Sequence, residues 1–385
     1  MRNNNSYDLL IEILKHEHES RIDKLANGII ENPFINPYKI KYEYSGTTFG
    51  NRYLRKMSGI INKIDKSISS KTIEKEEDSD EFWYVDGEIM SLNFLIYILQ
   101  HKPDIPLEIY DSKDSQTLIN YVRSKLYIGA VRVFPKSRIL DSMEFNKLNS
   151  EYQSNINISK EGYWESYGFK SVVLLDLLNG LSSLVSDYYL DEFHNHIEKQ
   201  GYIFDIGSFI GDSAYIFRKY LPNPILCFEP DSINRKVLQQ NIILNNINNI
   251  SVTEEGVSNK SGEISVMMSG AATKVLDDIE TDNKIKITTI DEISKQKDIP
   301  KISLIKMDIE GEEYNALLGG EEMIRKDKPM LIISLYHGGK DFFEIPKLIR
   351  SFSAEYKFRF LQLDKRLPAS EFVLLAYIEN RKGAN

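Results

Sequence analysis

The sequence has 385 residues, a hydrophobic fraction of 42% and a formal net charge of −9 at pH 7. This length favours two domains over one, and the composition is that of an ordinary globular protein. The acidic balance disfavours a nucleic-acid partner, because binding to phosphates requires a basic face.

Cysteine content and hydropathy predict a protein of the cytoplasm. Cys227 is the single cysteine, and it lies in an apolar run where a buried free thiol is expected, so no intramolecular disulfide forms. The N-terminus lacks the apolar core of a secretion signal. The longest apolar stretches, 92–99 and 172–185, are too short or too interrupted to cross a bilayer, so we expect no membrane span.

Residues 1–160 are predicted to form an accessory region of mixed helices and strands, with no catalytic constellation. A polar stretch rich in Asn and Ser, 149–161, is the expected boundary to a second domain at 161–385. The predicted helices of the accessory region are 1–35, 54–68, 90–100 and 115–124, and its predicted strands are 38–44, 103–110 and 126–134.

The second domain is predicted to open with helical segments and to continue into a strand, a glycine turn and a helix. The run 202–206 is short and apolar, which is the pattern of a buried parallel strand. Gly207 and Gly211 bracket the turn that follows, and Asp212 or Ser213 is the expected N-cap of the helix. Glycine lacks a Cβ, so the backbone can turn sharply and a ligand can approach it closely.

Asp205 and Glu229 stand at the ends of two successive strands, 229 − 205 = 24 positions apart. Dinucleotide-binding folds place a ribose-binding carboxylate about 20 residues beyond the glycine turn, and a carboxylate can accept both hydrogen bonds of a cis-diol. The spacing G-x-x-x-G differs from the G-x-G-x-x-G that seats a pyrophosphate on a helix N-terminus. A ligand with a ribose but no phosphate fits better, and S-adenosylmethionine is such a ligand.

Strands and helices alternate along the rest of the chain, which predicts a doubly wound, mostly parallel sheet of the α/β class with right-handed crossovers. The last two strands are expected to pair antiparallel. The predicted helices are 172–190, 231–245, 311–325 and 341–351, and the predicted strands are 225–228, 250–255, 262–268, 286–289, 302–309, 329–336, 356–363 and 372–378.

Polar residues stand at the carboxyl ends of five predicted strands. Ligands of open α/β sheets bind beyond the carboxyl ends of parallel strands, so these residues are expected to converge on one crevice. They are Asp205, Glu229, Glu255, Asp308 and His337.

The motifs of the C-terminal half resemble those of the FkbM-type S-adenosylmethionine-dependent methyltransferases, a class I Rossmann-like family. The resemblance covers roughly residues 190–379, and its most specific part is the Lys-x-Asp-x-Glu-Gly block. Ser334 is a departure, because many relatives have Glu there. The matching segments are Asp205-Ile-Gly-x-x-x-Gly211, Phe228-Glu229-Pro230, Thr289-Ile290-Asp291, Ile305-Lys306-Met307-Asp308-Ile309-Glu310-Gly311, Lys328-Pro329, Ile333-Ser334-Leu335-Tyr336-His337, Asp341 and Glu344-Ile345-Pro346.

The resemblance implies a binding site for S-adenosylmethionine along the glycine turn. Gly207, Ser208 and Gly211 would line the methionine and ribose side of the cofactor. Asp205 would orient that turn or the cofactor's amino group.

The resemblance also assigns the remaining cofactor contacts and the reaction. Glu229 would bind the ribose hydroxyls, Glu255 and Gly256 would lie at the adenine, and Asp308 would face the sulfonium. Family members are mostly O-methyltransferases that act on sugars or other hydroxylated metabolites, which implies a small-molecule or glycan acceptor.

His337, Asp308 and Glu310 are the candidate catalytic residues. A sugar hydroxyl is a poor nucleophile, and His337 at a strand tip could take its proton, with Asp308 or Glu310 sharing the role or orienting the ring. The alternatives are that His337 only caps a Gly-Gly turn and that Glu310 only begins a helix. A divalent metal on these three residues is not expected, because no further carboxylate pair completes the set. Lys306 is expected to pair with a buried carboxylate.

Two other functions are compatible with the sequence. A nucleotide- or sugar-nucleotide-dependent Rossmann enzyme would share the strand and glycine pattern, although the glycine spacing argues against a nicotinamide cofactor. A non-catalytic cofactor-binding scaffold would share the entire site. Oligomeric state is not indicated by any motif.

Overall fold

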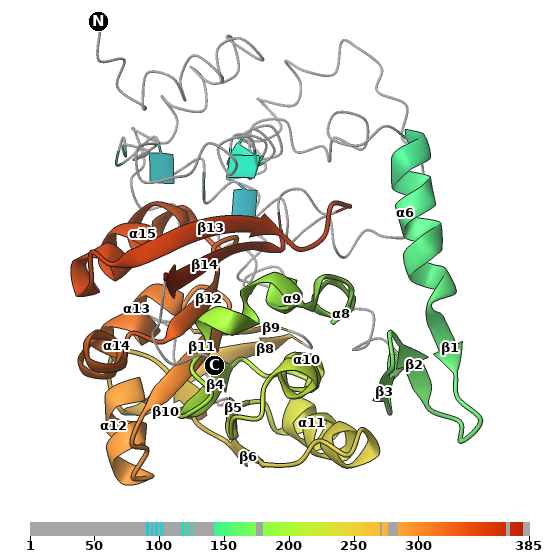
Figure 1. The fold of residues 1–385 in the computed structure, drawn as a ribbon, viewed down its shortest axis with the longest axis horizontal. Helices are drawn as coiled ribbons and strands as arrows, with labels where there is room; N and C mark the ends of the chain where they lie inside the picture. Colours follow the sequence, from blue (N-terminus) through green and yellow to red (C-terminus); the bar gives the residue numbers. More distant parts are fainter. Residues whose placement is uncertain are drawn as a thin grey trace, which may run out of the picture.

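The computed structural model describes residues 142–174, 180–269, 272–275, 284–366 and 370–379, together with twelve single residues between Met90 and Lys125 (Figure 1). The described residues within 90–101 and 117–125 are helical apart from Pro103 between them, in agreement with two of the predicted helices. The elements predicted at 1–35, 38–44, 54–68 and 126–134 lie outside the described residues, as does nearly all of 103–110.

A seven-stranded sheet with the order β13-β14-β12-β11-β4-β5-β6 forms the centre of the molecule. Neighbouring strands from β12 to β6 run parallel, whereas β14 is antiparallel to both β12 and β13. The predicted doubly wound, mostly parallel sheet with a closing antiparallel pair is therefore confirmed. The strands are β4 (Tyr202–Ile206), β5 (Ile225–Phe228), β6 (Ile250–Thr253), β11 (Ile302–Met307), β12 (Met330–Ser334), β13 (Tyr356–Gln362) and β14 (Phe372–Ile378).

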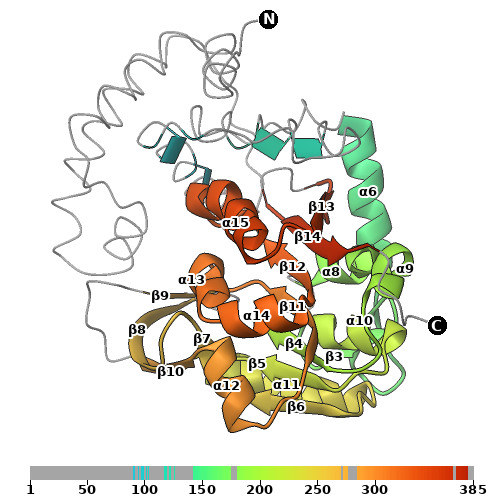
Figure 2. The same ribbon diagram turned by 60° about the vertical axis from the view of Figure 1, so that its left-hand side comes forward.

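Two groups of helices cover the two faces of this sheet, as Figures 1 and 2 show. Alternate residues of each strand enter different hydrophobic cores, so that Ile203 packs with one group and Phe204 with the other. The first group comprises α8 (Leu181–Ser186), α9 (Leu190–Phe193), α10 (Asp212–Tyr220) and α11 (Ser232–Leu244). The second comprises α12 (Ile290–Gln296), α13 (Glu313–Leu318), α14 (Glu321–Asp327) and α15 (Gly339–Phe352).

A second sheet, with the order β7-β10-β8-β9, lies beside the carboxyl ends of β5 and β6. Its small hydrophobic core contains Val266, Ile285 and Ile287, with Ile264 packed against it. Its strands are β7 (Gly256–Val257), β8 (Gly262–Ser269), β9 (Ala272–Val275) and β10 (Lys284–Thr288). A third sheet combines β1 (Ile156–Ile158), β2 (Trp164–Ser166) and β3 (Phe169–Ser171).

The entry to the second domain differs in detail from the secondary structure predicted for it. Helix α6 (Ser142–Ser154) runs through much of the polar stretch that was expected to be a boundary. The single helix predicted at 172–190 is interrupted, because Asp187, Tyr188 and Tyr189 all have φ near +50° and form a 3-10 turn instead. The division at residue 160 stays a prediction.

The helix predicted at 311–325 is also two helices, α13 and α14, separated by Gly319 and Gly320. A Cβ on Gly319 would lie 2.2 Å from the Ser258 carbonyl oxygen, so the close approach of two loops requires glycine here. In the part of the chain that is described, no helix combines the length and the apolar character needed to cross a membrane.

Candidate functional site: an open pocket and an acid–histidine cluster

The glycine turn after β4 lies against the end of β11. Gly207 has φ +77°, and a Cβ on it would be 2.0 Å from the Asp308 carbonyl oxygen. No side chain fits there, since the backbones of two neighbouring strand ends meet at this point. Gly207 was predicted to permit a sharp turn. The structure adds a second reason for glycine, the close contact with Asp308, which lies 308 − 207 = 101 positions further along the chain.

Helix α10 begins directly after this turn, without the predicted side-chain cap. Gly211 is the N-cap residue, with φ +90°, and no side chain caps the helix. Asp212 is the first helical residue, and its carboxylate accepts a hydrogen bond from the Ser183 hydroxyl of α8. Ser213 donates to Asp205 Oδ2 at 2.7 Å. The Asp212 side chain therefore bonds to α8 and the Ser213 side chain bonds to β4, so neither side chain caps the backbone amides of α10.

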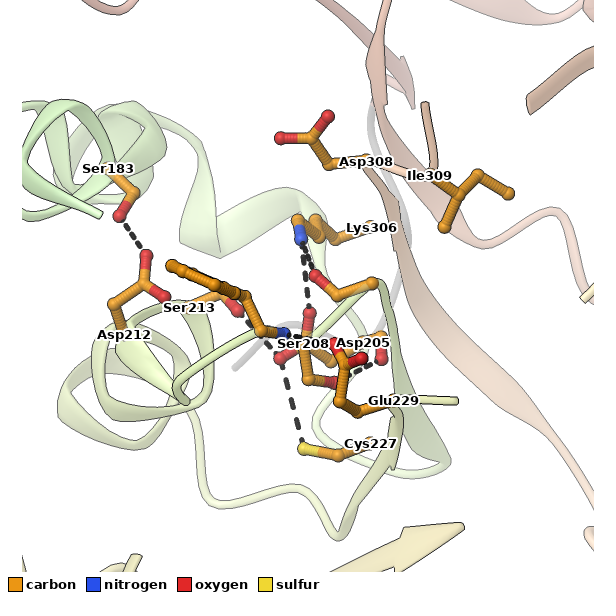
Figure 3. A network of polar contacts seen from close by, with 12 residues as sticks. Ser183, Asp205, Ser208, Asp212, Ser213, Cys227, Glu229, Lys306, Asp308 and Ile309 are labelled. Atoms are coloured by element: carbon orange, nitrogen blue, oxygen red, sulfur yellow. Dashed lines mark hydrogen bonds and ion pairs between the residues drawn. The ribbon is translucent and has the colours of Figure 1, made fainter. Parts of the chain in front are cut away.

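Asp205 and Lys306 form a buried ion pair beneath the turn (Figure 3). Lys306 Nζ lies 3.6 Å from Asp205 Oδ1 and donates to the Gly207 carbonyl oxygen at 2.6 Å. Burial opposes the charge of Lys306, but the surrounding carboxylates, Asp205 first among them, outweigh it and raise its pKa. The expected pairing of Lys306 with a buried carboxylate is confirmed, and this pair fixes the turn.

Glu229 follows β5 and closes over the same turn. Its two carboxylate oxygens accept hydrogen bonds from the Phe209 and Asp231 amides, both at 2.9 Å. The side chain is nearly buried, and burial raises its pKa to about 7 in spite of these two donors. Each oxygen keeps lone pairs for further donors, so the carboxylate is held rigidly and can still receive a diol.

A pocket of about 640 Å³, open mouth included, lies between Glu229, the small sheet and the end of β11. Its apolar wall contains Phe209, Phe228, Val257, Ile264, Ile285 and Ile287, and its polar side chains are Glu229, Asn234, Asp308, Glu310 and Glu312. A flat apolar group can pack against the isoleucines while polar groups reach the carboxylates.

Half of the predicted site residues line this pocket, namely Gly207, Glu229, Gly256, Asp308 and Glu310. The others do not line it. Asp205 and Ser208 are buried below the turn, where Ser208 Oγ donates to the Asp205 carbonyl at 2.6 Å. Gly211 faces Leu238, and Glu255 accepts a hydrogen bond from Thr253 instead. The contacts of these residues with a cofactor stay predictions.

His337, the fifth residue outside the pocket lining, is enclosed by three carboxylates. Its Nδ1 lies 2.9 Å from Glu313 Oε1, and its Nε2 lies 3.4 Å from Asp308 Oδ1 and 3.8 Å from Glu310 Oε2. The ring is 1% exposed, and Glu313 is fully buried behind it. Glu313 is itself held by the amides of Ile309 and Gly311, at 2.8 and 3.0 Å.

The protonation state of His337 follows from this enclosure. Burial alone would lower its pKa, but Glu313, Glu310 and Asp308 outweigh burial and raise the pKa to about 10. The ring is therefore an imidazolium at neutral pH, which donates hydrogen bonds and cannot accept a proton. The structure thus argues against His337 as the proton acceptor and leaves the two partly exposed carboxylates, Asp308 and Glu310, for that role.

Asp308 connects the histidine cluster to the pocket. Its side chain is 30% exposed and lines the pocket, while Tyr336 donates its hydroxyl to the two carboxylate oxygens at 3.0 and 3.2 Å. Glu310, also on the pocket wall, has φ +59°, a strained backbone conformation of the kind that occurs at functional sites. The Asp308 carboxylate is thus oriented by Tyr336 and lies between the buried His337 ring and the open pocket.

A divalent cation could also be held here, since Asp308, Glu313 and His337 each offer a ligand atom within 4.8 Å of the other two. Glu313 supplies the third ligand that sequence reasoning did not find. Both of its oxygens already accept backbone amides, however, so a metal would have to displace or share these bonds.

Sequence reasoning missed Glu313, Tyr336 and the isoleucine wall. Glu313 lies three positions after Glu310 in a stretch rich in Glu, and this spacing was the available signal. Tyr336 lay inside a quoted motif without a role. The wall could not be found, because its residues come from β8 and β10, strands that meet the pocket only through the second sheet.

This strand order and crevice define a class I methyltransferase-like fold. Residues 205–360 match the family model described as the methyltransferase FkbM domain. Over this segment the chain is therefore similar to FkbM methyltransferase domains, as the motifs predicted. The matched segment begins at Asp205 and ends within β13, so it contains every residue of the pocket and of the histidine cluster.

Among curated proteins, the chain is similar to the hexuronic acid methyltransferase AglP of Haloferax volcanii, with 27% identity over 154 residues. The alignment spans 40% of this chain and 62% of that relative. Among solved structures, the FkbM methyltransferase of Methylobacillus flagellatus has 21% identity, a TM-score of 0.38 and coverage of 51% of this chain and 54% of its own. A putative O-methyltransferase of Klebsiella pneumoniae has 12% identity, a TM-score of 0.32 and coverage of 69% and 100%.

Proposed function

We propose that this protein is an S-adenosylmethionine-dependent methyltransferase that methylates a hydroxyl group of a sugar or another hydroxylated metabolite. The observation that carries the proposal is Glu229, a carboxylate fixed by two backbone amides at the edge of the pocket of an FkbM domain. The similarity to a hexuronic acid methyltransferase supports a glycan or small-molecule acceptor.

The pocket suggests how the cofactor would bind. Glu229 would accept hydrogen bonds from both ribose hydroxyls, and the adenine would pack between Phe209 and the isoleucine wall near Gly256. Asp308, which also lines the pocket, would face the sulfonium, whose positive charge it attracts. These contacts involve a ribose, an adenine and a sulfonium, so the proposed ligand does not need a pyrophosphate.

Transfer would be an in-line displacement, in which the acceptor oxygen forms a bond to the methyl carbon as the carbon–sulfur bond breaks. The products are the methylated oxygen and neutral S-adenosylhomocysteine, and the hydroxyl proton must leave. Asp308 is the best-placed acceptor for this proton, because it is partly exposed, oriented by Tyr336 and close to the His337 cation. In this scheme the His337 cation orients the Asp308 carboxylate, and Glu310 assists as a second carboxylate.

Calorimetric titration with S-adenosylmethionine and S-adenosylhomocysteine tests the cofactor site. We expect micromolar-range binding that Glu229→Ala weakens by about 1–3 kcal/mol, because ribose hydroxyls are left without an acceptor. A matched control is Glu254→Ala, since Glu254 is an exposed acid near the end of β6 that pairs with Lys286 outside the pocket lining. Failure of the folded wild-type protein to bind either compound would contradict the proposal, and NAD and nucleotide sugars would then be the next ligands to titrate.

A further inference from the structure

The segment that carries Tyr336 and His337 leaves the central sheet before it reaches the site. Pairing between β12 and β14 ends at Ser334, opposite Val373, and the last amide of the ladder is that of Leu335, which donates to Phe372 at 2.9 Å. Leu335 is fully buried, and Tyr336 is 8% exposed. Buried carbonyl groups at this point need hydrogen-bond donors from outside the sheet.

Two residues of the N-terminal region supply those donors. Lys125 Nζ donates to the Tyr336 carbonyl oxygen at 2.7 Å, and the Tyr121 hydroxyl donates to the Leu335 carbonyl oxygen at 3.4 Å. Lys125 is fully buried and Tyr121 is 1% exposed. The Tyr121 ring also stacks on Phe372, with centroids 3.9 Å apart and planes 11° apart, so the contact is a packed interface between the two regions.

The Lys125 bond acts on the peptide group that joins Tyr336 to His337. A charged donor makes a stronger hydrogen bond than a neutral one, and here it fixes the plane from which both side chains extend. Tyr336 then reaches Asp308, and His337 lies between Glu313 and Asp308. A change of this plane would move both groups relative to the Asp308 carboxylate.

We propose that Lys125 and Tyr121 are positioning residues, so that the N-terminal region supports the Tyr336–His337 segment of the catalytic site. The inference rests on the proposed function only in calling this site catalytic. It assigns a role to a part of the chain in which no motif was found. Neither residue lines the pocket, so cofactor affinity should not depend on them.

Nuclear magnetic resonance of the full-length protein with labelled histidine can test this role. The chain has 6 histidines, and a His337→Gln variant identifies the His337 ring signals by their loss. In Lys125→Met we expect those signals to move, because the ring is no longer held among the carboxylates. Affinity for S-adenosylhomocysteine should stay within about twofold of wild type, a free-energy change below about 0.5 kcal/mol.

Matched variants separate positioning from general stability. Tyr97→Phe removes another hydrogen bond between the N-terminal region and α15, from Tyr97 to Glu344 at 3.2 Å, and should leave the His337 signals in place. Lys125→Gln retains an N–H donor and should restore signals close to those of wild type. Tyr121→Phe removes only a hydroxyl and should give a smaller displacement than Lys125→Met.

Folded Lys125→Met with wild-type His337 signals would overturn the proposal, as would an equal displacement in Tyr97→Phe. If Lys125→Met does not fold, Tyr121→Phe decides, because unchanged His337 signals in that variant contradict the inference. Wild-type protein that fails to bind S-adenosylhomocysteine would refute the proposed function and not the positioning role, which the histidine signals measure independently.

Discussion

The two halves of the crevice are built in different ways. On the side of β4 and β5, the glycine turn and the Glu229 carboxylate that closes over it lie within one short stretch, from Asp205 to Asp231. On the side of β11 and β12, the histidine cluster joins α13, a strand tip and residues of the N-terminal region. The first half depends on local chain geometry, and the second depends on contacts between distant segments.

This difference suggests that the halves can be disabled separately. Changes near Glu229 should act on cofactor affinity, whereas changes near His337 should act on turnover at constant affinity. Four predictions test the separation, beginning with the largest expected effect.

Asp308→Asn should reduce turnover by about 100- to 10,000-fold, because an amide cannot accept the hydroxyl proton in the transition state. Affinity for neutral S-adenosylhomocysteine should change little, since the side chain keeps its shape and its Tyr336 partner. The measurement is the rate of S-adenosylhomocysteine formation with any acceptor that the wild-type enzyme methylates. Near-wild-type turnover would remove Asp308 from the proton transfer.

Gly207→Ala should lower the free energy of unfolding by about 2–3 kcal/mol and abolish tight cofactor binding, because its Cβ would collide with the Asp308 carbonyl. Gly262→Ala is the matched control. Gly262 also has positive φ, at +145°, but a Cβ there would meet nothing within 4 Å. Chemical denaturation of both variants separates the collision from backbone strain, and equal losses would show that the contact with β11 is unimportant.

Affinity for S-adenosylhomocysteine should rise with pH. The pKa of Glu229 is raised to about 7, and the ionised carboxylate is the form that accepts both ribose hydroxyls. Binding that requires this form should strengthen about tenfold between pH 6 and pH 8. Glu229→Gln should remove the trend, and an unchanged slope in that variant would assign the titration to another group.

The last prediction concerns the pH dependence of stability that His337 contributes. Its pKa is raised to about 10 in the folded protein and is near 6.5 in the unfolded chain. The stabilisation is therefore complete below pH 6.5 and is lost as pH rises through 10. Denaturation between pH 7 and pH 10 should show a steeper fall for wild type than for His337→Gln.

Other groups that face His337 titrate as well, and they must be included in that comparison. Glu313 of α13 has a lowered pKa, and Asp341 of α15 and Glu371 before β14 have pKa values raised by burial. Asp308 and Glu310 complete the surroundings. Only the difference between wild type and His337→Gln isolates the imidazolium, and a parallel fall in both would show that the ring is neutral.

The sequence by itself determined the fold of the C-terminal half and the glycine-turn side of the pocket. Alternating apolar strands and helices specify a doubly wound sheet, and the spacing from the glycine turn to Glu229 is set along one short stretch of chain. Periodicity and turn chemistry are local properties, and they can be read without knowledge of the tertiary contacts.

Only the tertiary structure decided the protonation state of His337 and the surroundings of the histidine cluster. His337 was predicted as a base from its residue type, but three carboxylates from other segments hold its proton. Likewise, the isoleucine wall depends on the second sheet, and the Tyr336 carbonyl depends on Lys125, 211 positions away. Electrostatic shifts and buried hydrogen bonds depend on distances in space, and separation along the sequence does not fix those distances.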